Sequence, residues 1–382
     1  MKKNITLALV FALVALTLIG CSASPSDSAG AGPDGTPAAT DGAVQLGLGL
    51  ITSIGKSRDY KVDADGKETL ALGQVDTVIA AATFDAEGRV VAVTIDTAQT
   101  KVEFDNEMKV ATDKTGQFKT KVELGNEYGM KRVSSIEKEW FEQIAALEKW
   151  MVGKTVAEIK GQKVKETNPD HPGVPDDPEL TSLVTISVQD YIAAVEKAYN
   201  NAVAIENADT LGLGHIISIA KSKDYGVDAN GIETLPTAQV DTVIAATTFD
   251  ADGKVTGTII DTAQTKVNFD QEGKITSDKT ALIKSKLELG DEYGIGRVSS
   301  IGKNWYEQID ELGKWMVGKT VAEIKGLPVK EVNPDHPAVP DTPELTSLVT
   351  ITVQDYIAAV EETAQSKPHL IISTYFNSPA EN

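Results

Sequence analysis

Two runs of apolar and β-branched residues dominate the first patterned part of the chain. Residues 74–84 and 89–104 are rich in Val, Ile and Thr, and the turn sequence Asp85-Ala-Glu-Gly88 joins them. Runs of this kind favour strands, and a short connection that contains glycine favours an antiparallel hairpin. The Gly-rich apolar stretch 46–60 predicts a further strand.

The apolar spacing then changes from that of a strand to that of a helix. Apolar residues recur at helical intervals at Ile136, Trp140, Ile144, Leu147 and Met151. This stripe predicts a helix from Ile136 that stops at Gly153. Thr155-Val-Ala-Glu158 has the form of a capping box and predicts a short second helix. A third helix is expected after Ser187, so the predicted fold is α+β, an antiparallel sheet with packed helices.

The whole pattern is written twice. From about Leu46 to Glu196 each residue has a counterpart 165 positions later, as Thr185 has in Thr350 (350 − 185), and no gap is needed. A period of this length indicates a duplicated domain, because solenoid repeats are far shorter. We therefore expect repeat domain 1 at 44–203, repeat domain 2 at 204–363 and an unrepeated tail at 364–382, in which residues 369–376 resemble an added strand.

Composition limits the classes of partner. Hydrophobic residues make up 41% of the chain, enough for packed cores, and the formal net charge is −20. A surface this acidic repels the phosphates of nucleic acid. Nucleic acid is therefore excluded as an expected partner.

The N-terminus predicts export. Met-Lys-Lys-Asn is followed by an apolar run and by Leu18-Ile-Gly-Cys21, which resembles the lipobox of bacterial lipoproteins. We expect residues 1–21 to be a lipoprotein signal peptide that ends at the lipidated Cys21, and 22–43 to be a flexible tether. The protein would then be anchored by lipid to the outer face of a bacterial membrane. Cys21 is the only cysteine, so no disulfide is expected.

Familiar catalytic signatures such as a P-loop, Gly-x-Ser-x-Gly or His-Glu-x-x-His are absent from the sequence, and we assign no catalytic residue. His171 and His336 each lie in Asn-Pro-Asp-His-Pro. Either they bind a metal together with nearby aspartates, or they are struts that hold a proline-rich loop in shape. The strut is the favoured interpretation, so no metal is expected.

Each repeat carries a matched set of aromatic residues beside a Gly-rich loop. The loop Gly125-Asn-Glu-Tyr-Gly-Met130 returns in repeat 2, and candidate site residues in and beside the two loops are Tyr128, Tyr293, Arg132 and Arg297. Either this loop approaches a ligand closely or it is a turn at a helix N-terminus. Trp140 lies on the helical stripe and is expected in the core. Phe141 and Trp150 lie off the stripe and are expected to line a pocket.

A proline-rich approach at 168–181 leads into Ser182-Leu-Val-Thr185, and the same arrangement precedes Ser347-Leu-Val-Thr350. A hairpin sheet, later helices and a Ser-x-x-Thr segment before the last helix together resemble the small FMN-binding domain of exported bacterial proteins. In that family a Ser-Gly-Ala-Thr type of motif carries FMN. Here Leu183 and Val184, like Leu348 and Val349, stand where the family has Gly and Ala.

The resemblance implies an FMN site in each repeat, covalent or non-covalent, at Ser182, Thr185, Ser347 and Thr350. The phosphate would lie at the N-terminus of the last helix, and Arg132 and Arg297 would offset the acidic surroundings. The alternative interpretation is purely structural. In it Val184 and Ile186 end a strand, Thr185 is exposed, and Ser187 and Thr352 are helix N-caps.

Three classes of function remain open. The first is an extracytoplasmic flavin-based electron carrier with redox partners. The second is a non-enzymatic surface lipoprotein that binds a small solute or peptide in a cleft beside the aromatic residues. The third is a structural envelope protein. None of the three is an enzyme in the ordinary sense.

Overall fold

The computed structural model describes residues 42–366 and 369–371. Cys21, the expected signal peptide, most of the tether and most of the tail lie outside these residues. In repeat 1 the longer strands are β1 (Gln45–Ser53), β4 (Leu72–Phe84) and β5 (Val90–Glu103). The two-residue strands are β2 (Lys61–Val62), β3 (Glu68–Thr69), β6 (Val164–Lys165), β7 (Val174–Pro175) and β8 (Val203–Ala204). The helices are α1 (Lys121–Leu124), η1 (Gly125–Tyr128), η2 (Met130–Arg132), α2 (Trp140–Met151), α3 (Val156–Lys160) and α4 (Gln189–Asn200).

Repeat 2 has the same order of elements. Its longer strands are β9 (Thr210–Ser218), β12 (Thr237–Phe249) and β13 (Val255–Asn268), and its two-residue strands are β10 (Gly226–Val227), β11 (Glu233–Thr234), β14 (Val329–Lys330), β15 (Val339–Pro340) and β16 (His369–Leu370). Its helices are α5 (Lys286–Leu289), η3 (Gly290–Tyr293), η4 (Ile295–Arg297), α6 (Trp305–Met316), α7 (Val321–Lys325) and α8 (Gln354–Gln365). No helix of the described residues is long and apolar enough to cross a membrane.

Each repeat builds one four-stranded antiparallel sheet, in the order β5-β4-β1-β8 and β13-β12-β9-β16. The expected hairpins are confirmed as β4–β5 and β12–β13, and the predicted α+β class is confirmed with them. Within the described residues, β8 and β16 each pair with two residues of their neighbouring strand. Among the described residues, the backbone groups on the outer edge of β1 after Leu46 have one bridge, from Thr52 to Ile283, and side chains reach the rest of that edge and the edge of β9 after Leu211.

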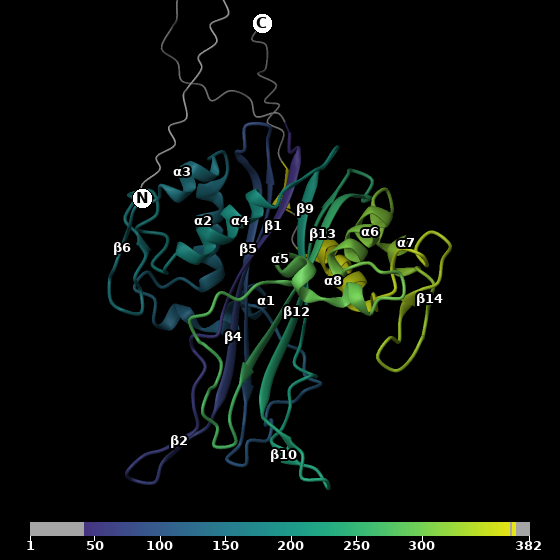
Figure 1. Cartoon of the computed structure of the whole chain (residues 1–382). Helices are drawn as coiled ribbons and strands as arrows, with labels where there is room; N and C mark the ends of the chain where they lie inside the picture. The colour runs from purple at the N-terminus through teal and green to yellow at the C-terminus, as the bar shows by residue number, and fades with distance from the viewer. Residues whose placement is uncertain (1–41, 367–368, 372–382) are drawn as a thin grey trace, which may run out of the picture. The chain divides into compact units, whose positions relative to one another are not determined.

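Both faces of each sheet are buried. Along β4, Val78, Ala80 and Phe84 face the helices of the same repeat, while Val75 and Ile79 face away from them. Figure 1 shows α2, α3 and α4 over the sheet of repeat 1, and α6, α7 and α8 over that of repeat 2. A strand buried on both faces reads as a nearly continuous apolar run, as residues 74–84 do.

The inner faces of the two sheets share one hydrophobic core. Phe104 and Phe269 pack with ring centroids 5.1 Å apart. At Gly73 a side chain would place its Cβ only 2.3 Å from that of Ala238, so glycine is what lets the two sheets approach there. Burial of a Phe or Leu side chain stabilises a fold by about 1.5–3 kcal/mol, so this core joins the repeats firmly. The described part of both repeats belongs to one compact unit.

The glycines of the Leu-Gly-Leu-Gly-Leu sequence in β1 bring α4 onto the sheet. A Cβ at Gly47 or Gly49 would lie 2.0 Å from a carbonyl oxygen of α4. Gly212 and Gly214 of β9 meet α8 in the same way, at 2.0 and 2.1 Å. Glycine is therefore required at these positions by the close helix–strand approach rather than by a turn.

Several predicted helix boundaries change. α2 begins at Trp140 rather than Ile136, with a capping box made by Glu139 and Glu142, and Trp140, Ile144, Leu147 and Met151 are buried as the stripe predicted. The capping boxes at Thr155 and Thr320 are confirmed. The N-caps of α4 and α8 are Val188 and Val353, so the assignment of Ser187 and Thr352 was wrong.

The strand β8 spans the expected boundary between residues 203 and 204, and α8 runs past residue 363. β16 is the described beginning of the strand suggested for residues 369–376.

Candidate functional site

Thr185 and Thr350 occupy equivalent places against the first long helix of their repeats. The amide and the hydroxyl of Thr185 donate to Gln143 Oε1, at 2.9 and 3.2 Å. In repeat 2, Thr350 donates to Gln308 Oε1 at 2.8 and 3.2 Å. Both threonines are half-buried rather than exposed, and both glutamines are fully buried. These glutamines were missed by the sequence analysis, although their identity in the two repeats was a signal.

The other residues of the expected flavin motif lie at the surface. Ser182, Ser347, Arg132 and Arg297 are exposed. No hydrogen bond or ion pair among the described residues joins them to Thr185 or Thr350. The structure therefore places each threonine with a buried glutamine and does not gather the predicted set into one site.

Tyr128 belongs to a separate group, which we call the aromatic–lysine cluster and define as Lys121, Tyr128, Trp140 and Tyr191. The Lys121 ammonium lies 5.0 Å from the ring centroid of Tyr128 and 5.2 Å from that of Trp140. Trp140 Nε1–H donates to the Tyr191 hydroxyl at 3.0 Å. Burial lowers the pKa of Lys121 to about 8 and raises the pKa of Tyr191 to about 12.

The same cluster recurs in repeat 2. Lys286 lies 4.9 Å from the ring of Tyr293 and 5.2 Å from that of Trp305, whose Nε1–H donates to Tyr356 at 2.9 Å. Trp140 and Trp305 are almost fully buried, which agrees with the core interpretation of the stripe.

A pocket of about 710 Å³ lies between the repeats. We call it the inter-repeat pocket. Its walls come from β5, α1, η1 and α2 of repeat 1 and from β9 and α8 of repeat 2. It is lined by Thr94, Ile95, Asp96, Val122, Glu123, Gly125, Asn126, Phe141, Ile144, Ala145, Glu148, Leu213, His215, Glu362, Gln365 and Ser366. Phe141 lines it, as predicted for a pocket, and Gly125 and Asn126 show that the Gly-rich loop reaches it.

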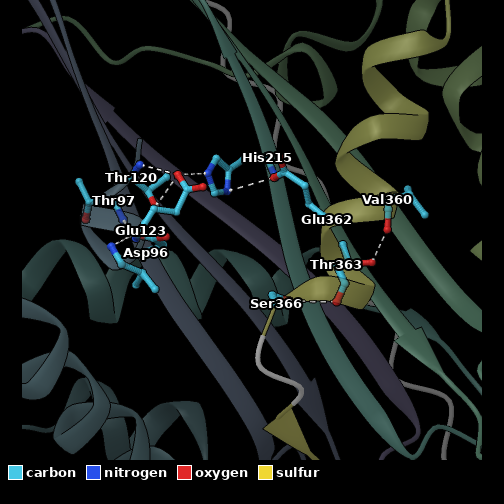
Figure 2. Close-up of polar contacts among 10 residues, drawn as sticks. Asp96, Thr97, Thr120, Glu123, His215, Val360, Glu362, Thr363 and Ser366 are labelled. Carbon is cyan, nitrogen blue, oxygen red and sulfur yellow. Dashed lines mark hydrogen bonds and ion pairs between the residues drawn. The ribbon is translucent and has the colours of Figure 1, made fainter. Parts of the chain in front are cut away.

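His215 is the centre of the polar network in this pocket (Figure 2). Its Nε2 lies 2.9 Å from Glu123 Oε2, and its backbone N–H donates to Glu362 Oε2 at 2.9 Å. The residue is 8% exposed. Its Nδ1 lies 4.0 Å from Glu362 Oε2, too far for a hydrogen bond, and has no hydrogen-bond partner among the described residues. Residues from both repeats therefore meet at one imidazole.

The charges favour a protonated His215. Burial opposes its protonation, but the hydrogen bond to Glu123 and the charges of Asp96, Glu123 and Glu362 outweigh burial and raise the pKa of His215. The hydrogen bond to His215 is in turn the main reason that the pKa of Glu123 is lowered. The raised pKa of His215 and the lowered pKa of Glu123 both favour an ion pair between the two side chains.

Carboxylates dominate the rest of the lining. Asp96 accepts from the amides of Thr97 and Val122 at 2.6 and 3.1 Å, and burial raises its pKa. Burial also raises the pKa of Glu362. Glu148 accepts from the Ile95 amide at 2.6 Å, and burial raises its pKa to about 8. The lining contains no lysine or arginine, so the pocket is acidic.

Four residues of the pocket have counterparts 165 positions away in the other repeat, and these counterparts form a second region. We call it the mate region and define it as Leu50, Lys197, Glu288 and Gly313. These stand for His215, Glu362, Glu123 and Glu148 of the pocket. The Lys197 ammonium lies 2.5 Å from Glu288 Oε1 and donates to the Leu50 carbonyl at 2.9 Å. The mate region is therefore bridged by its own lysine.

The remaining candidates from the sequence contribute less. His171 is exposed, and its backbone pairs with that of Asn168 to close the loop; a strut made by its side chain stays a prediction. No group of three or more His, Cys, Asp or Glu side chains within the described ranges is arranged to hold a metal ion. Trp150 is half-buried under the Lys154 ammonium, 4.7 Å from its ring, and does not line the inter-repeat pocket.

Comparison of the chain with protein-family models, with curated proteins and with solved structures finds no match.

Proposed function

We propose that this protein is an exported, lipid-anchored binding protein that holds a small solute in the inter-repeat pocket. The observation that carries the proposal is the pocket itself, about 710 Å³ in volume, walled by both repeats and lined by apolar side chains with convergent polar groups. Volumes of roughly 300–1,000 Å³ with this mixture of walls are usual for small-molecule sites. Export and the lipid anchor rest on the sequence around Cys21 alone.

The placement of the pocket supports binding by a largely preformed site. Its two halves are fixed by the core that the sheets share, where Phe104 meets Phe269. The apolar wall from Phe141, Ile144 and Leu213 would cover the carbon part of a solute, and the polar wall around His215 would orient it. A preformed pocket spends little affinity on ordering its own side chains.

The test is to fill the pocket. The mature chain is screened by native mass spectrometry against a mixture of small amines, amino acids, sugars and carboxylic acids. Ala145→Trp places an indole on an exposed lining position of α2, and we expect it to weaken binding at least 100-fold. Asp310→Trp, at the equivalent position of α6, is the matched control and should bind as the wild type does. Binding that survives Ala145→Trp, or no binding by any solute, contradicts the proposal.

A flavin carrier is the second candidate. It is favoured by the identical placement of Thr185 and Thr350, each half-buried and bonded to a buried glutamine. The surroundings fit a phosphate poorly, however. The amides of Val184, Thr185 and Val188 already donate to protein acceptors, and Asp190 stands in the first turn of α4. These residues therefore supply no basis for a redox step.

Absorbance and intact mass decide the flavin question. A flavin carrier would be yellow, and the increment in mass would be lost in Thr185→Ala and Thr350→Ala. Colourless protein that takes up no added FMN removes this candidate and leaves the solute-binding proposal untouched, because the two threonines do not line the inter-repeat pocket.

A further inference from the structure

The mate region shows what kind of group its scaffold binds. There the Lys197 ammonium is held by a carboxylate of α5 and by a carbonyl on the open edge of β1. Its side chain is only 26% exposed, so this ammonium is partly withdrawn from water. A desolvated ammonium needs acceptors on several sides, and the region supplies Glu288 Oε1 and the Leu50 carbonyl oxygen.

The inter-repeat pocket keeps these acceptors and lacks the lysine. Glu123 on α1 is the counterpart of Glu288 on α5. The N–H of His215 points to the open edge of β9, where it meets Glu362. Because the N–H and C=O of a strand residue point to the same side in an antiparallel pair, the His215 carbonyl faces that edge as Leu50 does. Glu362 stands where Lys197 stands in the mate region. The pocket thus has a carboxylate at the position where the mate region has an ammonium group.

We propose that the inter-repeat pocket binds a ligand with a protonated amine on a short carbon chain, and that its ammonium takes the place that Lys197 Nζ holds in the mate region. This inference rests on the proposed function and names the ligand class for the same pocket. Glu123, Glu362 and the His215 carbonyl are the acceptors of the ammonium.

Two further features of the pocket agree with such a ligand. The carbon chain has an apolar wall to cover it, made by Phe141, Ile144 and Leu213. The buried Nδ1 of His215 has no hydrogen-bond partner among the described residues and can meet a second polar group of the ligand. An anionic ligand would face Asp96, Glu123 and Glu362 with only His215 as a positive charge, which disfavours it electrostatically.

The experiment compares head groups on one carbon chain. Binding of pentylamine, pentanol and pentanoate to the mature chain is measured by titration calorimetry at pH 7, together with amines of two to six carbons and the corresponding diamines. We expect an amine of the series to bind at least 10-fold more tightly than its alcohol, and the carboxylates not to bind.

Glu362→Lys copies the residue of the mate region into the pocket. We expect the new lysine to pair with Glu123, as Lys197 pairs with Glu288, and to weaken amine binding at least 100-fold. The variant also removes the acceptor of the His215 N–H, so its melting temperature is measured beside the wild type to show that it is folded. Glu361→Lys makes the same change of charge one residue away, outside the lining, and should leave binding unchanged.

The outcomes distinguish failure of the inference about the ligand from failure of the proposed function. If an alcohol, a sugar or a carboxylate binds better than every amine, and Ala145→Trp abolishes that binding, the pocket is a solute site but the inference about its ligand is wrong. Amine binding that is unaffected by Glu362→Lys overturns the inference as well. If no solute of any charge binds, both proposals fail.

Discussion

The inter-repeat pocket and the mate region are built from equivalent elements of the two repeats, but a lysine bridges the mate region and carboxylates line the pocket. Each brings a short helix of one repeat to the open strand edge of the other, with a glutamate at its tip. In the mate region Lys197 closes the gap by pairing with that glutamate. In the pocket a histidine pairs with it instead, and Glu362 adds negative charge.

The difference shows how few substitutions separate a contact bridged by a lysine from an acidic pocket. A partly buried glutamate is costly when it is unpaired, so a scaffold that places one at an interface must supply a cation. The mate region supplies Lys197 from its own chain. The pocket supplies only His215 against Asp96, Glu123 and Glu362, and the excess of negative charge is available to a ligand. One region is thus closed by its own lysine, and the other is an acidic pocket.

The largest predicted effect is a loss of folding stability that affects the inter-repeat pocket and the mate region together. Phe104→Ala leaves a cavity in the core that joins the sheets, and we expect a loss of about 3–5 kcal/mol in the free energy of unfolding. Because the core is shared, both repeats should unfold in a single calorimetric transition at a lower temperature. Two separate transitions would show that the repeats are stable independently of one another.

The next effect is a dependence of stability on pH that Glu148 gives to the pocket, and that the mate region lacks at the equivalent Gly313. Glu148 has a folded pKa of about 8, above its ordinary value of 4.5, so the folded state binds more protons between these values. Its contribution to stability is complete below about pH 4.5 and is lost as the pH rises toward 8.

Glu148→Gln keeps the acceptor for the Ile95 amide and cannot ionise. We expect it to be more stable than the wild type by on the order of 2–4 kcal/mol at pH 9 and nearly equal to it at pH 5, measured by urea unfolding. The groups that face Glu148 across the pocket, Asp96, Glu123, His215 and Glu362, are unchanged in the variant. Glu107→Gln, at an exposed carboxylate, is the control; an equal gain there would contradict the role of burial.

A smaller effect comes from the mate region. Lys197→Met leaves Glu288 without its cation and the Leu50 carbonyl without its donor. Because the pair is about a quarter exposed, we expect a loss of about 2 kcal/mol, less than for a fully buried pair. Lys160→Met, at an exposed ion pair with Glu196, should cost less than 1 kcal/mol. Equal losses in thermal unfolding would show that the mate region is not special.

The smallest predicted effect concerns the threonine–glutamine hydrogen bonds, which are equivalent in the two repeats. Thr185→Ala removes the hydroxyl bond to Gln143 and keeps the amide bond, so a loss of about 1 kcal/mol is expected. Thr350→Ala should cost the same in repeat 2, since its contacts are equivalent. A clear inequality in chemical unfolding would mean that the two threonines have diverged in role.

Much of the fold was predictable because its signals are local. The hairpins follow from β-branched runs around a turn, the stripe from Trp140 to Met151 from helical spacing, and the capping box at Thr155 from residues three apart. The start of α2 was placed too early because Ile136 continues the apolar spacing, while the capping box at Glu139 that begins the helix was not recognised. The N-cap at Val188 was missed because it makes no side-chain bond.

The sequence by itself determined the duplication, the α+β class, the hairpin and the three longer helices of each repeat, because spacing along the chain controls which residues share a strand face or a helix face. It also singled out Phe141 as a pocket residue. Only the tertiary structure decided that Glu123 of one repeat meets His215 of the other, 92 positions away. That contact depends on how two sheets pack and on which strand edge is left open, and no local pattern records either. The exchange of Lys197 for Glu362 is visible in the sequence, but its meaning appears only where the two residues face their glutamates.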